Sequence, residues 1–308
     1  MTKKSISLVL ILSLVVCSLC ILCGCDLVRE ESVQANTEAT VTDSCLVEAG
    51  TLTVGVDASN TPYGGKNSSG DIVGYDVDYA NAVGAQMGLK VKIVDVAEDG
   101  KEALETKQVD VVFGMQKQAT KKKDTLSYAN SYLNDGIALF CKEDAKPASI
   151  SDVNFGSVKV LAQAGTDSTY AVQKAFGVST IVVTSSIEEA FEGLQSGTAD
   201  YMICNAVEGA YYARNYEGVS FVNYMSSANI TPIYAAVLAA NSELLNGVNI
   251  AVQEVASNGE QSTITNKWLS STGSALIPGG TDTSTLPAKI EAKKSTSSKS
   301  KKSSSKNN

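Results

Sequence analysis

The chain has 308 residues, of which 44% are hydrophobic and 19% are charged, and its formal net charge is -8. This size and composition suit two compact lobes, and the acidic balance argues against nucleic-acid binding, which depends on many Lys and Arg contacts to phosphate. The sequence contains no histidine, which excludes Ser-His-Asp and Cys-His triads, HExxH zinc sites and imidazole proton shuttles. A binding protein is therefore favoured over an enzyme, and we expect no metal and no cofactor.

The N-terminus has the features of a bacterial secretory signal. Lys3 and Lys4 precede the apolar run "ISLVLILSLVVCSLCILCGC", as the charged and apolar regions of such signals do. The run ends in "LCGC", which resembles a lipobox with cleavage before Cys25 and lipidation of its thiol. We predict that residues 1–25 are a lipoprotein signal peptide and that lipid anchors the chain at the extracellular face of the cytoplasmic membrane. An uncleaved membrane-spanning helix is the alternative.

Two polar segments flank the expected folded part. Residues 26–45 are rich in Glu, Thr, Ser and Asn and are predicted to form a disordered tether. Residues 273–308 end in "KKSTSSKSKKSSSKNN" and are predicted to form a disordered Ser/Lys-rich tail. The lysines of this tail could lie against an anionic membrane or cell-wall polymer, or they could simply be solvated.

Beyond the signal, the cysteines are Cys45, Cys141 and Cys204. They have neither CxxC spacing nor histidine partners, which argues against a zinc site. Outside the cell, one disulfide and one spare thiol are possible. For Cys204, in the apolar run "YMICN", a buried free thiol is the alternative.

The first half of the folded part alternates strands and helices. In "TLTVGVD", Leu52, Val54 and Val56 share one face with a period of two. In "YDVDYANAVGAQMG", Asp76 is a candidate N-cap and Gly88 a candidate stop. We predict strands at 51–57, 89–95 and 109–115 and helices at 75–88 and 101–108. This order predicts a parallel sheet covered by helices.

The pattern restarts in the second half, so that a second α/β lobe is expected. Ser185 and Glu188 suggest a capping box for a helix that stops at Gly197. We predict strands at 158–165, 180–185 and 199–205 and helices at 167–176, 185–197, 207–216, 242–259 and 261–270. Two such lobes suggest a cleft, with ligands beyond the carboxyl ends of the strands.

Three stretches carry a family resemblance. "GTLTVGVDASNTPYGGKNSSGDIVGYDVDYANAVGAQMGLKVKIVD" resembles the opening of family 3 extracellular solute-binding proteins, the receptors of polar amino-acid ABC importers. The second lobe adds "VLAQAGTDSTYAV" and "AFEGLQSGTADYMICN", and "NSELLNGVNIAVQEVASNGEQSTITNKWL" resembles the closing helices of the family. The resemblance covers the chain from about Gly50 to Leu269.

The resemblance implies a two-lobed, periplasmic-binding-protein-like clamshell in which each lobe is a mostly parallel sheet flanked by helices. Residues 46–139 and 233–272 would form lobe 1 and residues 140–232 lobe 2, joined by two hinge strands near 139–144 and 233–238. A transporter can distinguish the closed, liganded form from the open one. We expect a monomer that delivers a small polar solute, an amino acid or a derivative, to the permease of an ABC importer.

In lobe 1 the resemblance implies ligand contacts from Asp57, Asn60, Tyr63, Gly114, Met115 and Gln116. Asp57 follows the first strand, where its carboxylate would point into the cleft, and a turn or N-cap role is the alternative. Tyr63, after Pro62, fits an aromatic ring that stacks on the ligand, or an ordinary wall tyrosine. The residues that follow "VDVVF" would offer backbone and hydroxyl groups.

In lobe 2, Thr166, Asp167 and Ser168 open a helix whose free N–H groups and dipole suit a carboxylate, although Thr166 or Asp167 could be a plain N-cap. Asn205 stands where the family typically has an aspartate that accepts hydrogen bonds from the α-ammonium group. Asparagine keeps an acceptor but not the charge, which Asp57 or Asp167 could supply instead.

The anion clamp of the family also differs here. In the amino-acid binders an arginine after the third strand holds the α-carboxylate; here the position falls on Lys122 or, with a shift of one residue, on Lys121. A lysine gives a point charge rather than a planar fork, and the alternative is that these lysines only face solvent. The stretch "VAEDGKEAL" places Ala97 or Glu98 where an aromatic wall is frequent. A modified amino acid, a peptide-like compound or another small polar solute is therefore an open possibility.

Two other functions remain as alternatives on the same fold. One is an enzyme resembling cyclohexadienyl dehydratases, in which Glu98, Asp57 or a lysine would act as the general acid or base. The other is a sensory ligand-binding module.

Overall fold

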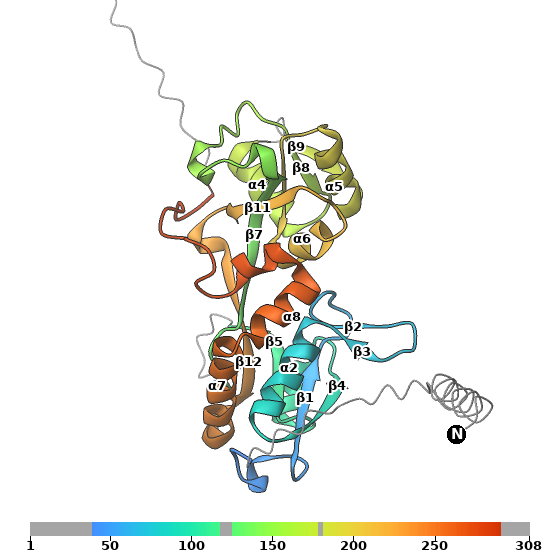
Figure 1. Ribbon diagram of the computed structural model, residues 1–308, viewed down its shortest axis with the longest axis vertical. Coiled ribbons are helices and arrows are strands. Elements are labelled where there is room, and N and C mark those ends of the chain that lie inside the picture. Colours follow the sequence, from blue (N-terminus) through green and yellow to red (C-terminus); the bar gives the residue numbers. More distant parts are fainter. Residues whose placement is uncertain (1–38, 118–124, 178–180, 291–308) are drawn as a thin grey trace, which may run out of the picture. The chain divides into compact units, whose positions relative to one another are not determined.

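The computed structural model describes residues 39–117, 125–177 and 181–290 (Figure 1). Lobe 1 contains strands β1 (Thr51–Val56), β4 (Lys90–Asp95), β5 (Val111–Gln116), β6 (Leu126–Tyr128) and β12 (Ile230–Leu238), the hairpin of β2 (Gly65–Lys66) and β3 (Ile72–Val73), and helices α2 (Tyr75–Gln86), α3 (Gly100–Glu105), α7 (Ser242–Ser257) and α8 (Glu260–Leu269). All residues of β1 are buried, because α2 and α3 both pack against this strand. As the alternating pattern predicted, Leu52, Val54 and Val56 join one core cluster together with residues of α2 and α7.

Lobe 2 contains strands β7 (Leu133–Lys142), β8 (Val160–Gln163), β9 (Ile181–Thr184), β10 (Tyr201–Asn205) and β11 (Val219–Tyr224), and helices α4 (Asp167–Phe176), α5 (Ile187–Ser196) and α6 (Ala206–Ala213). The predicted capping box of Ser185 and Glu188 is wrong, and a related pair of hydrogen bonds lies one residue further along the chain. Ser186 is the N-cap and accepts a hydrogen bond from the Glu189 N–H, and the Glu189 carboxylate accepts from the Ser185 N–H. Both donors at the helix start are thereby satisfied.

The two lobes share one sheet. Its strands follow the order β4-β1-β5-β12-β7-β10-β8-β9 within the described residues, with β6 paired to β12 and β11 to β7. Strand β1 is parallel to β4 and β5, and β8 is parallel to β9 and β10. The antiparallel partners are those of β7 and β12, the strands that connect the lobes. The predicted α/β fold class, two mostly parallel lobes joined by two hinge strands, is confirmed.

The crossings between the lobes lie several residues from their predicted positions. Strand β7 pairs with β12 over residues 133–136 and with β10 over residues 137–141. On the return, residues 230–233 of β12 pair with β7, and the strand then continues along β5 and β6. The predicted crossings near 139–144 and 233–238, and with them the lobe boundary at residue 139, are therefore wrong. The strands run without interruption through the crossings, so apolar patterning does not reveal where their partners change.

The folded part also extends beyond both predicted ends. Residues 39–45 were expected in a tether, but Val41 is buried in the core and the Asn241 side chain donates to the Cys45 carbonyl at 2.8 Å. Residues 273–290 were expected in a tail, but they lie against lobe 2 (Figure 1). There the Ser227 N–H donates to the Pro287 carbonyl, and Leu286 packs against the core. In both segments an apolar residue within a polar sequence, Val41 or Leu286, packs against the core and holds the segment there. Residues 26–38 and 291–308 lie outside the described part.

The three cysteines of the folded part, Cys45, Cys141 and Cys204, are free thiols. Cys141 stands opposite Tyr201, and Cys204 stands opposite Ala138, in the antiparallel pair of β7 and β10. The possible disulfide is thus not formed. In the part of the chain that the structure describes, no helix has the length and apolar content to cross a membrane. The signal segment with Cys25 lies outside that part.

Candidate functional site

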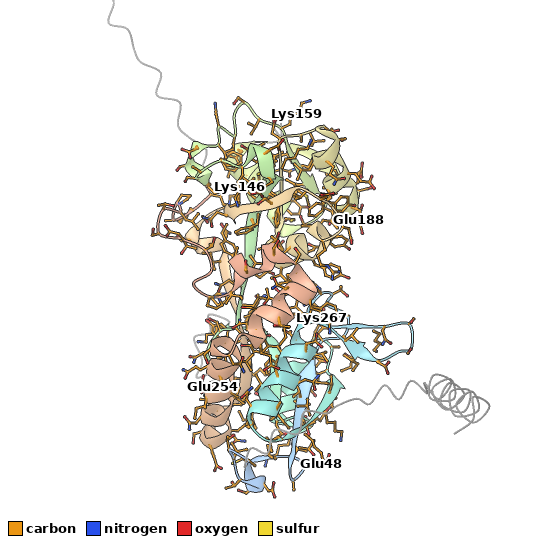
Figure 2. All side chains as sticks on the ribbon, in the orientation of Figure 1. Glu48, Lys146, Lys159, Glu188, Glu254 and Lys267 are labelled. Carbon is orange, nitrogen blue, oxygen red and sulfur yellow. The ribbon has the colours of Figure 1, made fainter. Side chains whose placement is uncertain are left out.

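Charged side chains such as Lys159, Glu188 and Lys267 lie at the outside of the ribbon (Figure 2). Against this background three aspartates are buried: the exposed fraction is 2% for Asp76, 6% for Asp110 and 8% for Asp135. Asp110 is fully engaged in lobe 1, where it accepts from the N–H groups of Val47 and Thr53. Asp76 and Asp135 instead belong to the surroundings of a pocket.

The pocket lies in lobe 1 and has a volume of about 150 Å³. Five residues predicted to contact the ligand line it together: Asp57, Asn60, Tyr63, Gly114 and Met115. They come from the loop after β1 and from the end of β5, because the carboxyl ends of adjacent parallel strands meet at one edge of the sheet. Ala97 and Glu98, at the position of the missing aromatic wall, line the same pocket.

The other predicted ligand residues do not line this pocket. Gln116 is the exposed last residue of β5. In lobe 2, Thr166 is the N-cap of α4 and accepts from the Thr169 N–H at 3.2 Å, and Asp167 and Ser168 form the first turn. Asn205 is the N-cap residue of α6, and its side chain is exposed. Lys121 and Lys122 lie outside the described residues.

Asp57 has the turn role that was considered as its alternative. Its Oδ1 accepts from the Ser59 N–H at 2.9 Å and from the Ser59 hydroxyl at 2.6 Å. The turn fixes the carboxylate at the carboxyl end of β1, at the wall of the pocket. The turn role and a ligand contact are therefore compatible.

Asp76 is the residue of this site that the sequence analysis missed. The N-cap of α2 is Gly74, so Asp76 lies inside the helix and not at its cap. Its Oδ1 accepts from the Tyr132 hydroxyl at 2.6 Å, and the carboxylate lines the pocket. Burial raises the pKa of Asp76 to about 7, although the Tyr132 hydrogen bond lowers it. The sequence did contain a signal for its burial. Asp76 lies four residues before Ala80, so it shares the apolar stripe of the helix that faces the core.

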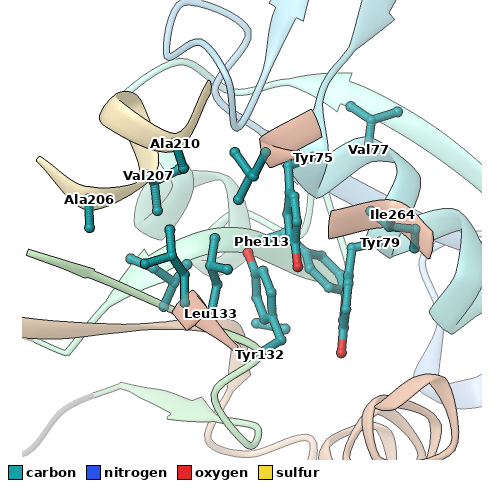
Figure 3. Packing of buried hydrophobic residues seen from close by; sticks show 14 of the residues in the cluster. Tyr75, Val77, Tyr79, Phe113, Tyr132, Leu133, Ala206, Val207, Ala210 and Ile264 are labelled. Carbon is teal, nitrogen blue, oxygen red and sulfur yellow. The ribbon is translucent and has the colours of Figure 1, made fainter. Parts of the chain in front are cut away.

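Gly114 is held by the same tyrosine. Its N–H donates to the Tyr132 hydroxyl at 2.8 Å, so this backbone donor, expected to serve the ligand, is already engaged. Tyr132 itself is fixed by packing between aromatic rings, with its centroid 4.5 Å from that of Tyr79 (Figure 3). The unit of Asp76, Tyr132 and Gly114 is therefore rigidly placed by the core.

Asp135 connects the pocket wall with lobe 2. Its Oδ2 accepts from the Tyr63 hydroxyl at 2.9 Å, and its Oδ1 accepts from the Val207 N–H in the first turn of α6 at 3.1 Å. Burial raises the pKa of both Asp135 and Tyr63 above their usual values. Because Asp135 lies on β7 where the chain leaves lobe 1, one carboxylate joins the pocket tyrosine, the hinge and helix α6.

Replacing Tyr63 by phenylalanine is expected to lower the free energy of unfolding by about 2 kcal/mol, because it removes a hydrogen bond to a buried carboxylate. Urea unfolding of the two proteins measures this loss. The matched control is Tyr170→Phe: Tyr170 is 65% exposed, so this variant should stay within about 0.5 kcal/mol of the wild type. Equal stabilities of the Tyr63 variant and the wild type would contradict the proposed importance of the Asp135 contact.

The pocket is acidic. Asp57, Asp76 and Glu98 line it, and no lysine or arginine is among its lining residues in the described part of the chain. No group of three or more His, Cys, Asp or Glu side chains among the described residues is arranged to hold a metal ion.

Comparison with known proteins gives a consistent result. Residues 52–271 match the family described as bacterial extracellular solute-binding proteins, family 3. The ABC transporter glutamine-binding protein GlnH of Bacillus subtilis is 24% identical over 273 residues, covering 87% of this chain and 97% of that protein.

Two solved structures are also similar. An ancestral cationic amino acid solute-binding protein is 32% identical with a TM-score of 0.58 and is covered to 96%, over 71% of this chain. A variant of an ancestral cyclohexadienyl dehydratase is 25% identical with a TM-score of 0.59 and is covered to 92%, also over 71% of this chain.

Proposed function

Because the chain belongs to the family 3 bacterial extracellular solute-binding proteins, we propose that it captures an amino acid or a close derivative and delivers it to the permease of an ABC importer. The observation that carries this proposal is the lobe 1 pocket, where five side chains and backbone groups expected to bind the ligand converge. The names of the similar proteins, which bind glutamine or cationic amino acids, support an amino-acid ligand.

The ligand would be held from both lobes. In lobe 1, Asp57, Asn60, Tyr63 and Met115 would contact it directly. Gly114 would only form part of the pocket wall, because its N–H already donates to the Tyr132 hydroxyl. In lobe 2 the contacts would come from the starts of α4 and α6, at Thr166, Asp167, Ser168 and Asn205. Gln116 and a lysine at 121 or 122 would complete the site at the end of β5. A carboxylate suits the helix starts and the lysine.

The receptor would act as a monomer at the extracellular face of the cytoplasmic membrane, anchored by a lipid on Cys25. The apolar signal with its "LCGC" end supports this placement. Residues 26–38 would then span the distance from the lipid to the folded part.

Native mass spectrometry of the mature chain tests the proposed function. We expect one small molecule, an amino acid or a relative, bound one to one and released by mild denaturation, because a closed cleft retains its ligand during purification. Stripped protein should regain a raised melting temperature when that molecule is added back. An empty protein whose melting temperature is unchanged by amino acids, short peptides and polyamines would contradict the proposal.

A dehydratase-like enzyme is the second candidate, and Asp76 is the observation that favours it. A carboxyl group with a pKa of about 7 in a pocket has the property of a general acid at neutral pH. One of the similar structures is an ancestral cyclohexadienyl dehydratase. Incubation with a cyclohexadienyl substrate, followed by the change in ultraviolet absorbance, distinguishes the two candidates: turnover that is lost in Asp76→Asn supports the enzyme, and a substrate that stays intact rules it out.

A further inference from the structure

After helix α8 the chain passes from lobe 1 back to lobe 2. Helix α8 is held in lobe 1, where the Thr265 and Tyr75 hydroxyls lie 3.0 Å apart and the Trp268 indole donates to the Asp78 carboxylate at 2.6 Å. The next element, the 3₁₀ helix η6 (Ser271–Leu276), contacts α8 and also α6, β7 and β11 of lobe 2. In the described part of the chain this is a third passage between the lobes, besides β7 and β12.

The passage is closely packed on both sides. Leu276 is fully buried in the core cluster that also contains Val83 of lobe 1 and Phe191 of lobe 2. A Cβ atom at Gly273 would stand only 2.5 Å from the Leu269 Cβ, so η6 lies against α8 without a gap. Such packing leaves η6 little room to shift relative to either lobe.

Residues 277–290 then follow lobe 2 and are drawn in red in Figure 1. The Asn223 side chain, on β11, donates to the Asp282 carbonyl at 3.0 Å. Leu286 and Ile290 pack against the apolar core of lobe 2. A hydrogen bond and two apolar side chains thus attach the segment to this lobe.

The end of the segment is attached beside the hinge. The Ser227 N–H donates to the Pro287 carbonyl at 2.9 Å. Ser227 opens the 3₁₀ helix η5 (Ser227–Asn229), which leads directly into β12. The first residue of β12, Ile230, pairs with Gly136 of β7 at the crossing. The chain that leaves this crossing along β12 therefore returns to it after α7, α8 and η6.

A segment packed on both lobes should restrain their movement. Two hinge strands allow lobes to rotate when a few backbone angles change. A third passage with its own contacts on each lobe must deform or detach during such a rotation, and this costs packing and hydrogen bonds. Residues 272–290 lie beyond residues 52–271, which match the family, so the family model does not account for this attachment.

We propose that residues 271–290 form a brace that limits the rotation of the two lobes about β7 and β12. The inference goes beyond the proposed function and depends on no particular ligand. The lobe 2 residues expected to meet a ligand do not line the lobe 1 pocket, so a ligand held from both lobes requires such a rotation. The brace therefore restrains the closing of the cleft.

Electron–electron double resonance between spin labels on the two lobes tests the inference without a ligand. The labels are attached through Glu102→Cys on α3 and Lys174→Cys on α4, two exposed helical positions. In the mature chain, Cys25→Ser and Cys45→Ser leave only native cysteines that are buried. The width of the label-to-label distance distribution then reports the range of rotations that the lobes sample.

The brace is released by Leu286→Asp, because this substitution places a charge in an apolar contact. The distance distribution should broaden by roughly 1.5-fold or more, since more rotations become accessible. The matched control is Ile250→Asp, which adds the same charge on α7 at a side chain that is 46% exposed. Its distribution should have the width of the wild type.

Each outcome decides the question. A Leu286→Asp protein with an unchanged width overturns the inference even if its melting temperature falls, because a segment that only covers lobe 2 would have that effect. Equal broadening in both variants also overturns it. If Leu286→Asp does not fold, Leu286→Ala and Asn223→Ala, which remove less, must broaden the distribution or the inference is wrong. Failure to bind any amino acid would contradict the proposed function and leave this result unaffected.

Discussion

Replacing Gly136 by alanine is expected to lower the free energy of unfolding by roughly 3 kcal/mol or more. Gly136 has a φ of +135° and lies on β7 opposite Ile230, at the point where the chain crosses between lobes. A Cβ atom there would overlap the carbonyl oxygen of Asn229. Since the obstructing atom belongs to the backbone, no side-chain rotation can relieve the overlap, and the two hinge strands would have to separate.

Urea unfolding of the Gly136→Ala protein measures this loss, and Gly70→Ala is the matched control. Gly70 also has a positive φ, +88°, but a Cβ atom added there would meet nothing within 4 Å. The control variant bears only the backbone strain, about 1 kcal/mol. If both variants lose the same amount, the close approach of the hinge strands does not matter for stability.

The same crossing affects the site, because Gly136 follows Asp135 directly. Asp135 holds the Tyr63 hydroxyl on one side and the first turn of α6 on the other. A displacement of β7 at Gly136 would therefore change the orientation of the pocket tyrosine relative to helix α6. Stability and the geometry of the pocket wall therefore depend on the same few residues of the hinge.

Much of the fold was predictable, because local signals repeat along the chain. The period of two in β1 and the Gly stop after α5 each identify one element, and the strand–helix order then limits the topology. The family resemblance based on these stretches was correct. The crossings were not predictable in this way: β7 is one continuous strand that exchanges β12 for β10 as its partner after Gly136. Tertiary packing decides which strand lies beside another, and the local sequence pattern carries no information about it.

The part of the site at the strand ends was predictable from the sequence, whereas the part formed by a buried residue of helix α2 was not. Asp57 and Met115 follow or end parallel strands, so their meeting in one pocket follows from topology. Asp76 was taken for an N-cap because aspartate is frequent there. Gly74 occupies the cap instead, since a Cβ atom at this position would overlap the Tyr63 carbonyl oxygen. This contact comes from the loop after β1, and nothing in the helix sequence indicates it.

Asp76 should also make the stability of the protein depend on pH. Burial raises its pKa from 3.8 to about 7 in the folded state, whereas the unfolded chain keeps the ordinary value. Between these two values the folded state holds a proton that the unfolded state has released, so the free energy of unfolding falls as the pH rises through this window. From pH 4.5 to pH 7.5 the loss from this one group is roughly 3 kcal/mol.

Urea unfolding of the wild type and of Asp76→Asn at pH 4.5, 5.5, 6.5 and 7.5 isolates this contribution. Asparagine still accepts the Tyr132 hydroxyl but cannot ionise, so the variant should gain stability relative to the wild type as the pH rises. Asp110, Asp135 and Glu208, whose pKa values are also raised by burial, act equally in both proteins and cancel in the difference. If the free energies of unfolding of the two proteins change with pH in parallel, burial does not raise the pKa of Asp76. A growing difference would mean that the folded protein holds Asp76 as a buried carboxylate whose ionisation costs stability.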